Sequence, residues 1–413
     1  NILTSPALES SSVTAGTTSR AFIPSWKRGS DKFTGVVVSN FGQEPFTLEM
    51  TAYKANGEPE NSVSNPFSGQ IPANNQYSLL GTEFFGQGTY QSDLSWIEVK
   101  AQNSSKMGSL FLFGVKDTSM LDGAESQTRY AKKLYFTRPL DEGILDQPGT
   151  SIELSVLNPF DEALTIRFSL ISNGTSIESD EIPIPGKGFF SGTTEQIFGA
   201  GHGMSDAYVC VETTDGPGIV GFARTEIPGI RTSLGLNAVE AGQERLLYSA
   251  QMAGGDGIVT SIRLVNTSSA DKMIKLRAIA DEGSLLAPEK EIEIPAKSAY
   301  ENTFSQLFGL AFIPGGIAVG SLEVESSGSG IIGDVVFADG DDLEYAMALP
   351  LQATGFRQAV FNHVANIPGV LFTGIALYNP GEEAADGEVT VYGVEGDPVA
   401  EAEIRLNPGE RLS

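Results

Sequence analysis

The stretch Phe33-Thr34-Gly35-Val36-Val37-Val38-Ser39-Asn40 returns near the end of the chain as Phe372-Thr373-Gly374-Ile375-Ala376-Leu377-Tyr378-Asn379. The two copies are 339 residues apart, and the correspondence continues without a gap over residues 22–59 and 361–398. Because 339 is three times 113, two further copies are expected between them. The sequence therefore predicts a tandem repeat of about 113 residues.

Shorter landmarks mark the two middle copies and recur at a similar spacing in all of the first three. They are Val156-Leu157-Asn158-Pro159 and Leu264-Val265-Asn266-Thr267; the pairs Ile71-Pro72, Ile184-Pro185 and Ile294-Pro295; and the segments Trp96-Ile97-Glu98-Val99, Tyr208-Val209-Cys210-Val211 and Ser321-Leu322-Glu323-Val324. The predicted segments are 1–20 (the end of a preceding repeat plus a linker), 21–131, 132–245, 246–358 and an incomplete 359–413.

Within a repeat, apolar residues alternate with polar ones. Phe46, Leu48, Met50 and Ala52 are separated by Thr47, Glu49 and Thr51, and the stretch 164–170 has the same period of two. Turn signals such as Asn56-Gly57 separate the runs, so each repeat reads as about seven short strands. The predicted fold class is all-β, with tandem immunoglobulin-like antiparallel β-sandwiches arranged as beads on a string.

Each of the first three repeats contains one short segment that is predicted to be helical, at Thr82–Gly86, Glu195–Gly199 and Ser305–Gly309. Each is expected to be a single turn closed by glycine, with its apolar pair plugging one end of the sandwich.

The two ends of the sequence do not follow the period. Residues 1–20 resemble the close of a repeat, and the fourth copy reaches Ser413 without its last three strands. Such a half-sandwich cannot bury both sheets. Two explanations stay open: the polypeptide continues beyond the given sequence, or another chain supplies strands by β-augmentation, which would give self-association through strand edges or ends.

Several of these segments resemble a repeat found in tandem in long secreted bacterial proteins, a family without a formal name. The similarity is carried by Phe361-Asn362-His363, Phe372–Gly381, Trp96–Val99, Leu110-Phe111-Leu112-Phe113-Gly114 and Gly221-Phe222-Ala223. The family pattern has a histidine where Ser25 stands in the first copy. The resemblance implies an uncharacterised secreted or surface module, and no site that depends on that histidine is shared by all copies.

Composition excludes several functions. The 26 Lys and Arg stand against 52 Asp and Glu (26 − 52 = −26), so nucleic acid would be repelled. The single cysteine, Cys210, lies in an apolar run and is predicted to be a buried strand residue. No stretch approaches the roughly 18 apolar residues of a membrane-spanning helix. We expect an extracellular or cell-surface location.

Catalytic groups are scarce. His202 and His363 are the only histidines, they lie in different repeats, and no Gly-x-Ser-x-Gly or zinc-binding pattern is present. Acidic residues near strand ends differ from copy to copy, unlike a single elaborated active site. The sequence therefore predicts that the chain is not an enzyme and needs no cofactor.

One acidic turn is a candidate Ca²⁺ site. Asp339, Asp341, Asp342 and Glu344 offer the hard oxygen ligands that Ca²⁺ prefers, without the spacing of an EF-hand. The alternative interpretation is a solvated turn.

Three Asn-x-Ser/Thr triplets, at Asn103, Asn173 and Asn266, leave glycosylation open.

These observations predict a non-catalytic extracellular structural protein, a tandem β-sandwich stalk, fibre or filament component with an adhesive role as a variant. The alternative is a set of carbohydrate- or surface-binding repeats attached to a larger secreted enzyme. That alternative requires clustered exposed aromatic residues, and only Trp26 and Trp96 are tryptophans, of which Trp96 is predicted to be buried.

Overall fold

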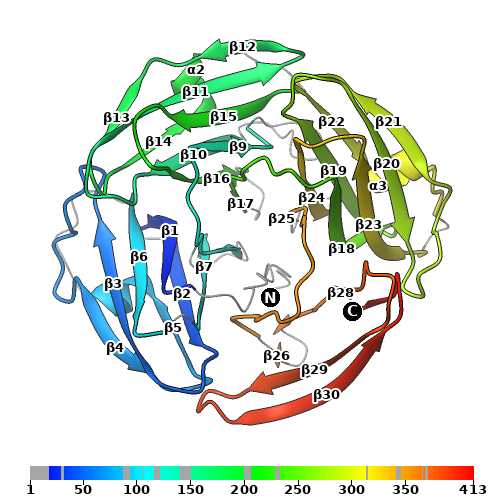
Figure 1. Ribbon diagram of the computed structural model, residues 1–413. Helices are drawn as coiled ribbons and strands as arrows, with labels where there is room; N and C mark the ends of the chain where they lie inside the picture. Colours follow the sequence, from blue (N-terminus) through cyan, green and yellow to red (C-terminus); the bar gives the residue numbers. More distant parts are fainter. Residues whose placement is uncertain are drawn as a thin grey trace.

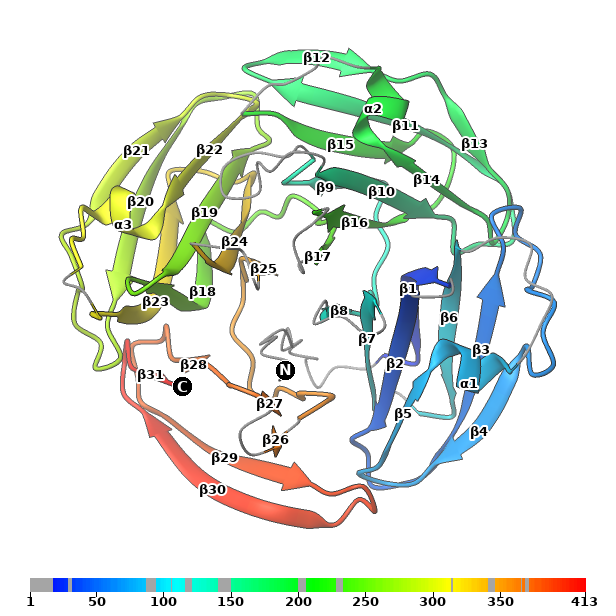
Figure 2. The same ribbon diagram turned by 180° about the vertical axis from the view of Figure 1, so that it is seen from behind.

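The described strands form three two-sheet sandwiches and a smaller fourth unit, which follow one another around a ring (Figures 1 and 2). The computed structural model describes residues 18–28, 32–86, 94–104, 106–115, 121–139, 150–199, 206–227, 233–312, 315–340, 346–364, 366–367 and 371–413.

The first unit has eight strands in two antiparallel sheets, with the orders β1-β6-β3-β4 and β5-β2-β7-β8. We number these eight strand positions one to eight. Their bounds are β1 Arg20–Lys27, β2 Lys32–Asn40, β3 Phe46–Tyr53, β4 Phe67–Ile71, β5 Gln76–Leu80, β6 Leu94–Gln102, β7 Met107–Val115 and β8 Leu121–Glu125.

The second unit repeats this plan with its fourth strand split in two, in the orders β12-β11-β15-β9 and β14-β10-β16-β17. Strand β13 also pairs with β11. The bounds are β9 Lys133–Phe136, β10 Ser151–Leu157, β11 Leu164–Ser172, β12 Thr175–Glu178, β13 Ile182–Ile184, β14 Phe189–Thr193, β15 Tyr208–Thr213, β16 Val220–Glu226 and β17 Ser233–Asn237.

The third unit has the orders β18-β23-β20-β21 and β22-β19-β24-β25. The bounds are β18 Leu246–Gly254, β19 Ile258–Asn266, β20 Lys272–Ile279, β21 Lys290–Ile294, β22 Ser298–Thr303, β23 Ala318–Ser326, β24 Ile331–Asp339 and β25 Ala346–Pro350.

The prediction of an all-β chain of antiparallel sandwiches is confirmed, while two details differ. Each complete unit has eight strand positions rather than about seven, because position one pairs with position six as a full strand. The order 1-6-3-4 also differs from immunoglobulin domains, in which the first, second, fifth and fourth strands share a sheet.

The predicted period of two is seen directly in the third strand of each complete unit. Burial alternates along β3 and β11, with Phe46, Leu48, Met50 and Ala52 at most 2% exposed. Each complete unit therefore has its own apolar core between its two sheets.

The three predicted helical turns are present as α1 (Gly81–Phe85), α2 (Thr194–Phe198) and α3 (Phe304–Phe308), each followed by a glycine with positive φ. The apolar pair of α1, Phe84 and Phe85, is fully buried in the first core, as expected. Each helix has five residues, and none in the described part of the chain has the length and apolarity to cross a membrane.

A buried asparagine ends the second strand of every unit and ties two turns together. In the first unit the Asn40 side-chain amide donates to the backbone carbonyls of Glu44, Ile71 and Pro72, and its Oδ1 accepts from the Gly42 N–H. Equivalent bonds recur in the other units: Asn266 donates to three carbonyls, Asn158 and Asn379 donate to two each, and the Oδ1 of all three accepts a backbone N–H. We call this set of hydrogen bonds the turn staple. It explains why the repeated stretch Phe33–Asn40 and its copies end in asparagine.

The fourth unit has the strand positions two to five but, in the described residues, no counterparts of six to eight. Its longer strands are β29 (Ala385–Tyr392) and β30 (Pro398–Leu406), which pair with each other. The remaining short strands are β26 Asn366–Ile367, β27 Leu371–Phe372, β28 Leu377–Tyr378 and β31 Arg411–Leu412.

Neighbouring units pack directly against each other, which differs from independent beads on a string. The 1-6-3-4 sheet of one unit covers the 5-2-7-8 sheet of the next, and strands such as β16 are therefore buried on both faces. In both views the turn between β29 and β30 lies beside the turn between β4 and β5, where Gly396 approaches the carbonyls of Ala73 and Asn74, so the fourth unit closes the ring against the first (Figures 1 and 2).

Candidate functional site

The most elaborate arrangement of polar and aromatic side chains lies where one sandwich meets the next. Between the first and second units, an apolar cluster joins Phe22 and Trp96 to Leu157, Phe189 and Val220. This cluster is separate from the cores inside the two sandwiches. The outward faces of β1 and β6 thus act as a docking surface for the second unit.

Trp96 is the centre of this contact. Its side chain is fully buried, its ring stacks on Tyr53 with centroids 4.8 Å apart, and its indole N–H donates to the Lys187 carbonyl at 2.8 Å. Lys187 lies in the turn before β14 with a positive φ of 56°. Its backbone is therefore held by an indole from the preceding unit.

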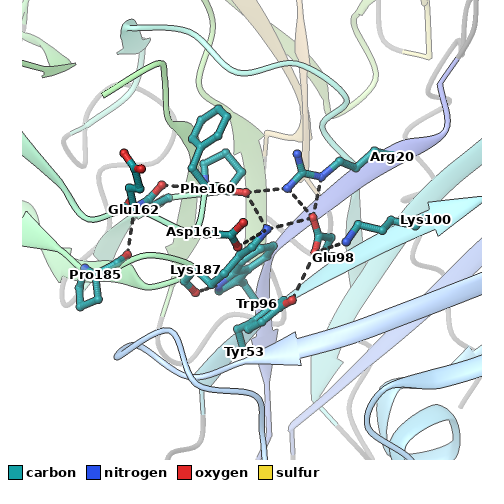
Figure 3. Close-up of polar contacts among 12 residues, drawn as sticks. Arg20, Tyr53, Trp96, Glu98, Lys100, Phe160, Asp161, Glu162, Pro185 and Lys187 are labelled. Carbon is teal, nitrogen blue, oxygen red and sulfur yellow. Dashed lines mark hydrogen bonds and ion pairs between the residues drawn. The ribbon is translucent and has the colours of Figure 1, made fainter. Parts of the chain in front are cut away.

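A buried carboxylate, Glu98, lies two residues further along β6 and is shared by both units (Figure 3). Its oxygens accept from Arg20 Nε at 2.5 Å and lie 2.9 Å from Lys100 Nζ and 3.4 Å from Lys187 Nζ. Tyr53 donates its hydroxyl at 3.4 Å. Arg20 and Lys187 also donate to the carbonyl of Pro159.

These contacts fix the charge of Glu98. Burial by itself raises the pKa of this carboxyl, but the hydrogen bond from Lys100 and the charges of Arg20 and Lys187 outweigh it, so the pKa lies below its ordinary value. Burial and the neighbouring Glu98 charge raise the pKa of Tyr53 to about 12. Glu98 is thus ionised near neutral pH and links the two units through its ion pairs.

A polar cavity of about 260 Å³ lies further along the same contact. It is lined by Lys27, Ser151, Glu153, Ser191, Gly192, Thr193, Gln196, Arg224 and Glu226. Lys27 pairs with Glu153 and Glu226, and Arg224 pairs with Glu226 at 3.2 Å. The charges on the cavity wall therefore largely neutralise one another.

The second and third units meet through a similar apolar cluster. Tyr135, Tyr208 and Cys210 of the second unit pack on Val265 and Ile332 of the third. Cys210 is a free, buried thiol on β15, as predicted, and burial raises its pKa to about 12. A thiol with that pKa is not a nucleophile at neutral pH.

Buried ion pairs reinforce this second contact. Arg138 donates to Glu301 Oε1 at 2.6 Å and pairs with Asp334, and Arg263 donates to Glu301 Oε2 at 2.7 Å. Arg263 also donates to the carbonyls of Thr137 and Ala207, both in the second unit, at 2.7 and 2.5 Å. Burial alone would raise the pKa of Glu301, but the two guanidinium groups hold it at about 2.

The third and fourth units are joined by polar bonds. Tyr378 donates to Glu323 at 2.5 Å, and Arg411 donates to the carbonyl of Ala250 and to Asp281, both at 2.6 Å. The Arg411 side chain is fully buried, although it lies near the end of the chain.

Of the four predicted Ca²⁺ ligands, only Asp339 lies in the described residues. Asp339 is the last residue of β24, where it pairs with Ile258, while Asp341, Asp342 and Glu344 lie outside the described residues. Across the described part of the chain, no group of three or more His, Cys, Asp or Glu side chains is placed to hold a metal ion.

Of the two histidines, only His363 lies in the described residues. His363 is half-buried, its Nδ1 has no hydrogen-bond partner among the described residues, and burial lowers its pKa. His202 lies outside the described residues.

Both tryptophans are buried, Trp26 inside the first core against Phe85 and Trp96 at the first contact. Burial of Trp96 is therefore confirmed.

Of the glycosylation triplets, Asn266 is fully buried because its side chain forms the turn staple, while Asn103 and Asn173 lie in exposed turns.

Trp96 and Cys210 were predicted to be buried, but the charged residues that join the units were not predicted, although the sequence carries a signal for them. Arg263 interrupts the apolar run Ile262–Val265, and Glu98 interrupts Trp96–Val99. A charged residue within a strand that is otherwise buried requires a partner, and here the partner comes from the adjacent unit.

Comparisons with protein-family models and with curated proteins found no match for this chain.

Proposed function

We propose that this chain is a non-catalytic structural segment of an extracellular or cell-surface protein, in which repeated β-sandwiches are locked together as one rigid curved scaffold. The observation that carries the proposal is the construction of the unit-to-unit contacts. Each of the first two combines a buried apolar cluster with ion pairs that link both partners.

The chemistry of the strongly perturbed groups supports the same proposal. Glu98 and Glu301 are held ionised by cations that are themselves used in the contacts, and the Cys210 thiol stays protonated. Ion-pair networks that serve structure also shift pKa values, and charges that are satisfied by each other inside a contact stabilise it.

The carbohydrate-binding alternative lacks its main support. It depends on clustered exposed aromatic rings on which sugars stack. Trp26 and Trp96 are at most 1% exposed, and the exposed aromatic residues Tyr130, Phe356 and Tyr392 lie in separate segments of the chain. The units are arranged in a ring (Figure 1), which fits a linear stalk less well than a compact scaffold. A compact scaffold is therefore favoured over both.

Small-angle X-ray scattering of the full chain tests the proposal. A compact scaffold of this length has a radius of gyration of about 22–25 Å, whereas loosely linked beads have a much larger one. Because the ion pairs are buried, we expect the same value at low and at 1 M salt. The double variant Trp96→Ala, Arg138→Ala should expand, while the control Val63→Ala, Arg167→Ala at exposed positions should not.

An expanded, salt-dependent profile for the unmodified chain would contradict the scaffold. A rise in melting temperature with a soluble oligosaccharide panel would instead favour the binding alternative.

A further inference from the structure

The inner side of the ring is formed by the last strands of the three complete units. Strand β8 of the first unit contacts β17 of the second, and β17 in turn contacts β25 of the third (Figure 2). Leu234 and Leu236 of β17 lie in one apolar cluster with Ala346 and Ala348 of β25. Strand β17 therefore takes part in both contacts.

The first unit carries a carboxyl group at a position where the second unit carries leucine. Asp122 lies opposite Phe113 in the ladder of the first unit, and Leu234 lies opposite Thr225 in that of the second. The two pairs are related by one offset (234 − 122 = 225 − 113 = 112), so Asp122 and Leu234 are equivalent. Leu234 packs in the apolar cluster with β25, whereas Asp122 meets the backbone of Gly235 in β17.

The Asp122 side chain is enclosed between the two units. It is 1% exposed, and its Oδ2 accepts the Gly235 N–H at 2.6 Å. The Gly123 N–H also donates to this carboxyl. Three residues further along β8, the Asn237 side-chain amide donates to the Glu125 carbonyl at 2.9 Å. Asp122 thus supplies one of two hydrogen bonds that join β8 to β17 across the boundary.

The charged group that faces Asp122 is Arg224 of β16, and it is engaged elsewhere. Its guanidinium lies over the Phe113 ring at 4.6 Å and pairs with Glu226 at 3.2 Å. Among the described residues, no side chain donates a hydrogen bond to the Asp122 carboxyl. An ionised Asp122 would therefore be poorly compensated. The ion pairs of Glu226 continue to Lys27 of β1, Lys32 of β2 and, through Lys27, Glu153 of β10.

Burial dominates the protonation of Asp122. It raises the pKa of this carboxyl from 3.8 to about 7, although the two backbone N–H groups and the charge of Arg224 act in the opposite direction. The second carboxyl of β8, Glu125, lies opposite Leu110, and burial alone raises its pKa to about 8. Glu301 in the contact between the second and third units differs, because two guanidinium groups hold it ionised.

Protonation favours the closed contact. When β8 and β17 separate, water reaches Asp122 and its pKa returns to the ordinary 3.8, whereas it is about 7 when the strands are together. The closed form thus binds the proton more tightly. The stability that the protonated carboxyl contributes is complete below pH 3.8 and is lost as pH rises from 3.8 to 7. Glu125 acts in the same direction, up to about pH 8.

We propose that the contact between β8 and β17 is a proton-operated latch of the ring, closed while the Asp122 carboxyl is protonated and loosened when it ionises. The apolar cluster of Trp96 contains no residue of β8 or β17 and holds the first two units together in both states. The latch regulates the scaffold proposed above and rests on that proposal.

Hydrogen exchange of the full chain tests the latch. The Gly235 amide is the reporter, because its N–H donates to Asp122. Its protection factor, corrected for the intrinsic pH dependence of exchange, should fall at least about tenfold per pH unit between pH 5 and pH 6.5 and level off above about pH 8.

Variants assign the effect to Asp122. Asp122→Asn keeps the shape without the charge and should remove about a tenfold fall per pH unit. Glu125→Gln is the matched control on the same strand and should leave that part of the fall in place. Asp122→Leu introduces the residue of the second unit and should remove the same part of the fall, should the asparagine variant fail to fold.

Two results would overturn the latch. One is a Gly235 protection factor that stays constant from pH 5 to pH 8 in the unmodified chain, a measurement that depends on no variant. The other is an undiminished fall in both Asp122→Asn and Asp122→Leu. Small-angle scattering separates the two proposals: a compact chain with constant Gly235 protection lacks the latch alone, whereas a chain already expanded at pH 5 lacks the scaffold on which the latch rests.

Discussion

The contact between the second and third units and the contact that closes the ring use the same face of the sandwich but different chemistry. Between the second and third units, Val265 and Ile332 pack against Tyr208 and Cys210, and Arg138 donates to Glu301 across the boundary. At the closing contact, the residues that correspond to Val265 and Ile332 are Ser39 and Gly108, which face Asn362. The fold is repeated, but the strength of each contact is set by a few outward side chains.

Among the described residues, the middle contact joins apolar surfaces and buried ion pairs, whereas the closing contact at Ser39 and Asn362 is polar, so we expect the closing contact to be the weaker of the two. Apolar side chains with enclosed ion pairs cannot separate without exposing both to water. A serine–asparagine hydrogen bond is readily exchanged for bonds to water. Four changes test this difference, from the largest expected effect to the smallest.

Arg138→Met should have the largest effect. It keeps much of the side-chain volume but leaves Glu301 and Asp334 without one of their cations inside the contact. Removal of one partner of a buried ion pair costs about 3–5 kcal/mol. Urea unfolding should show this loss, and Arg167→Met, whose exposed pairs with Glu178 and Glu181 lie on the surface of β11, should change stability by less than about 1 kcal/mol.

Acid should weaken the same contact in a defined pH range. The pKa of Glu301 is about 2 in the folded protein against an ordinary 4.5, so its charge stabilises the fold above pH 4.5 and this stability is lost as pH falls toward 2. We expect a loss of about 2–3 kcal/mol over this range. In Glu301→Gln this part of the pH dependence should disappear; an unchanged profile would contradict the assignment.

Trp96→Phe should weaken the first contact moderately. The change removes the indole N–H that donates to Lys187 and shortens the ring that stacks on Tyr53. A lost hydrogen bond to a buried carbonyl and a small cavity together cost about 1–2 kcal/mol. Thermal unfolding measures the effect. A loss below about 0.5 kcal/mol, the size of an ordinary surface substitution, would mean that Trp96 does not hold the contact.

Asn362→Ala should have the smallest effect. It removes the bond from Ser39 at the closing contact, and we expect less than about 1 kcal/mol. A loss as large as that of Arg138→Met would show that the ring is closed as firmly as its middle is joined, and would end the distinction between the two contacts.

Much of the fold was predictable because its signals are local. The alternation at Phe46–Ala52 predicts a half-buried strand without knowledge of any neighbour, and the glycine after each Phe-rich turn ends a helix through its own backbone freedom. The recurring asparagine also marked the repeat, although its bonds to carbonyls some 30 residues away could be recognised only in the structure.

The candidate site was less predictable. Glu98 and Arg263 appear as isolated charges in apolar strands, and their partners Lys187 and Thr137 lie in different repeats at no constant spacing. The acidic turn from Asp339, by contrast, gave an obvious local signal, yet most of it lies outside the described residues and stays a prediction.

By itself the sequence determined the repeat and the strand class, since these follow from periodicity and from one alignment of the chain with itself. Only the tertiary structure decided that the sandwiches form a ring with shared, ionised contacts. The physical reason is that sheet-on-sheet packing between units depends on which outward side chains meet across a boundary, and no local pattern specifies that meeting.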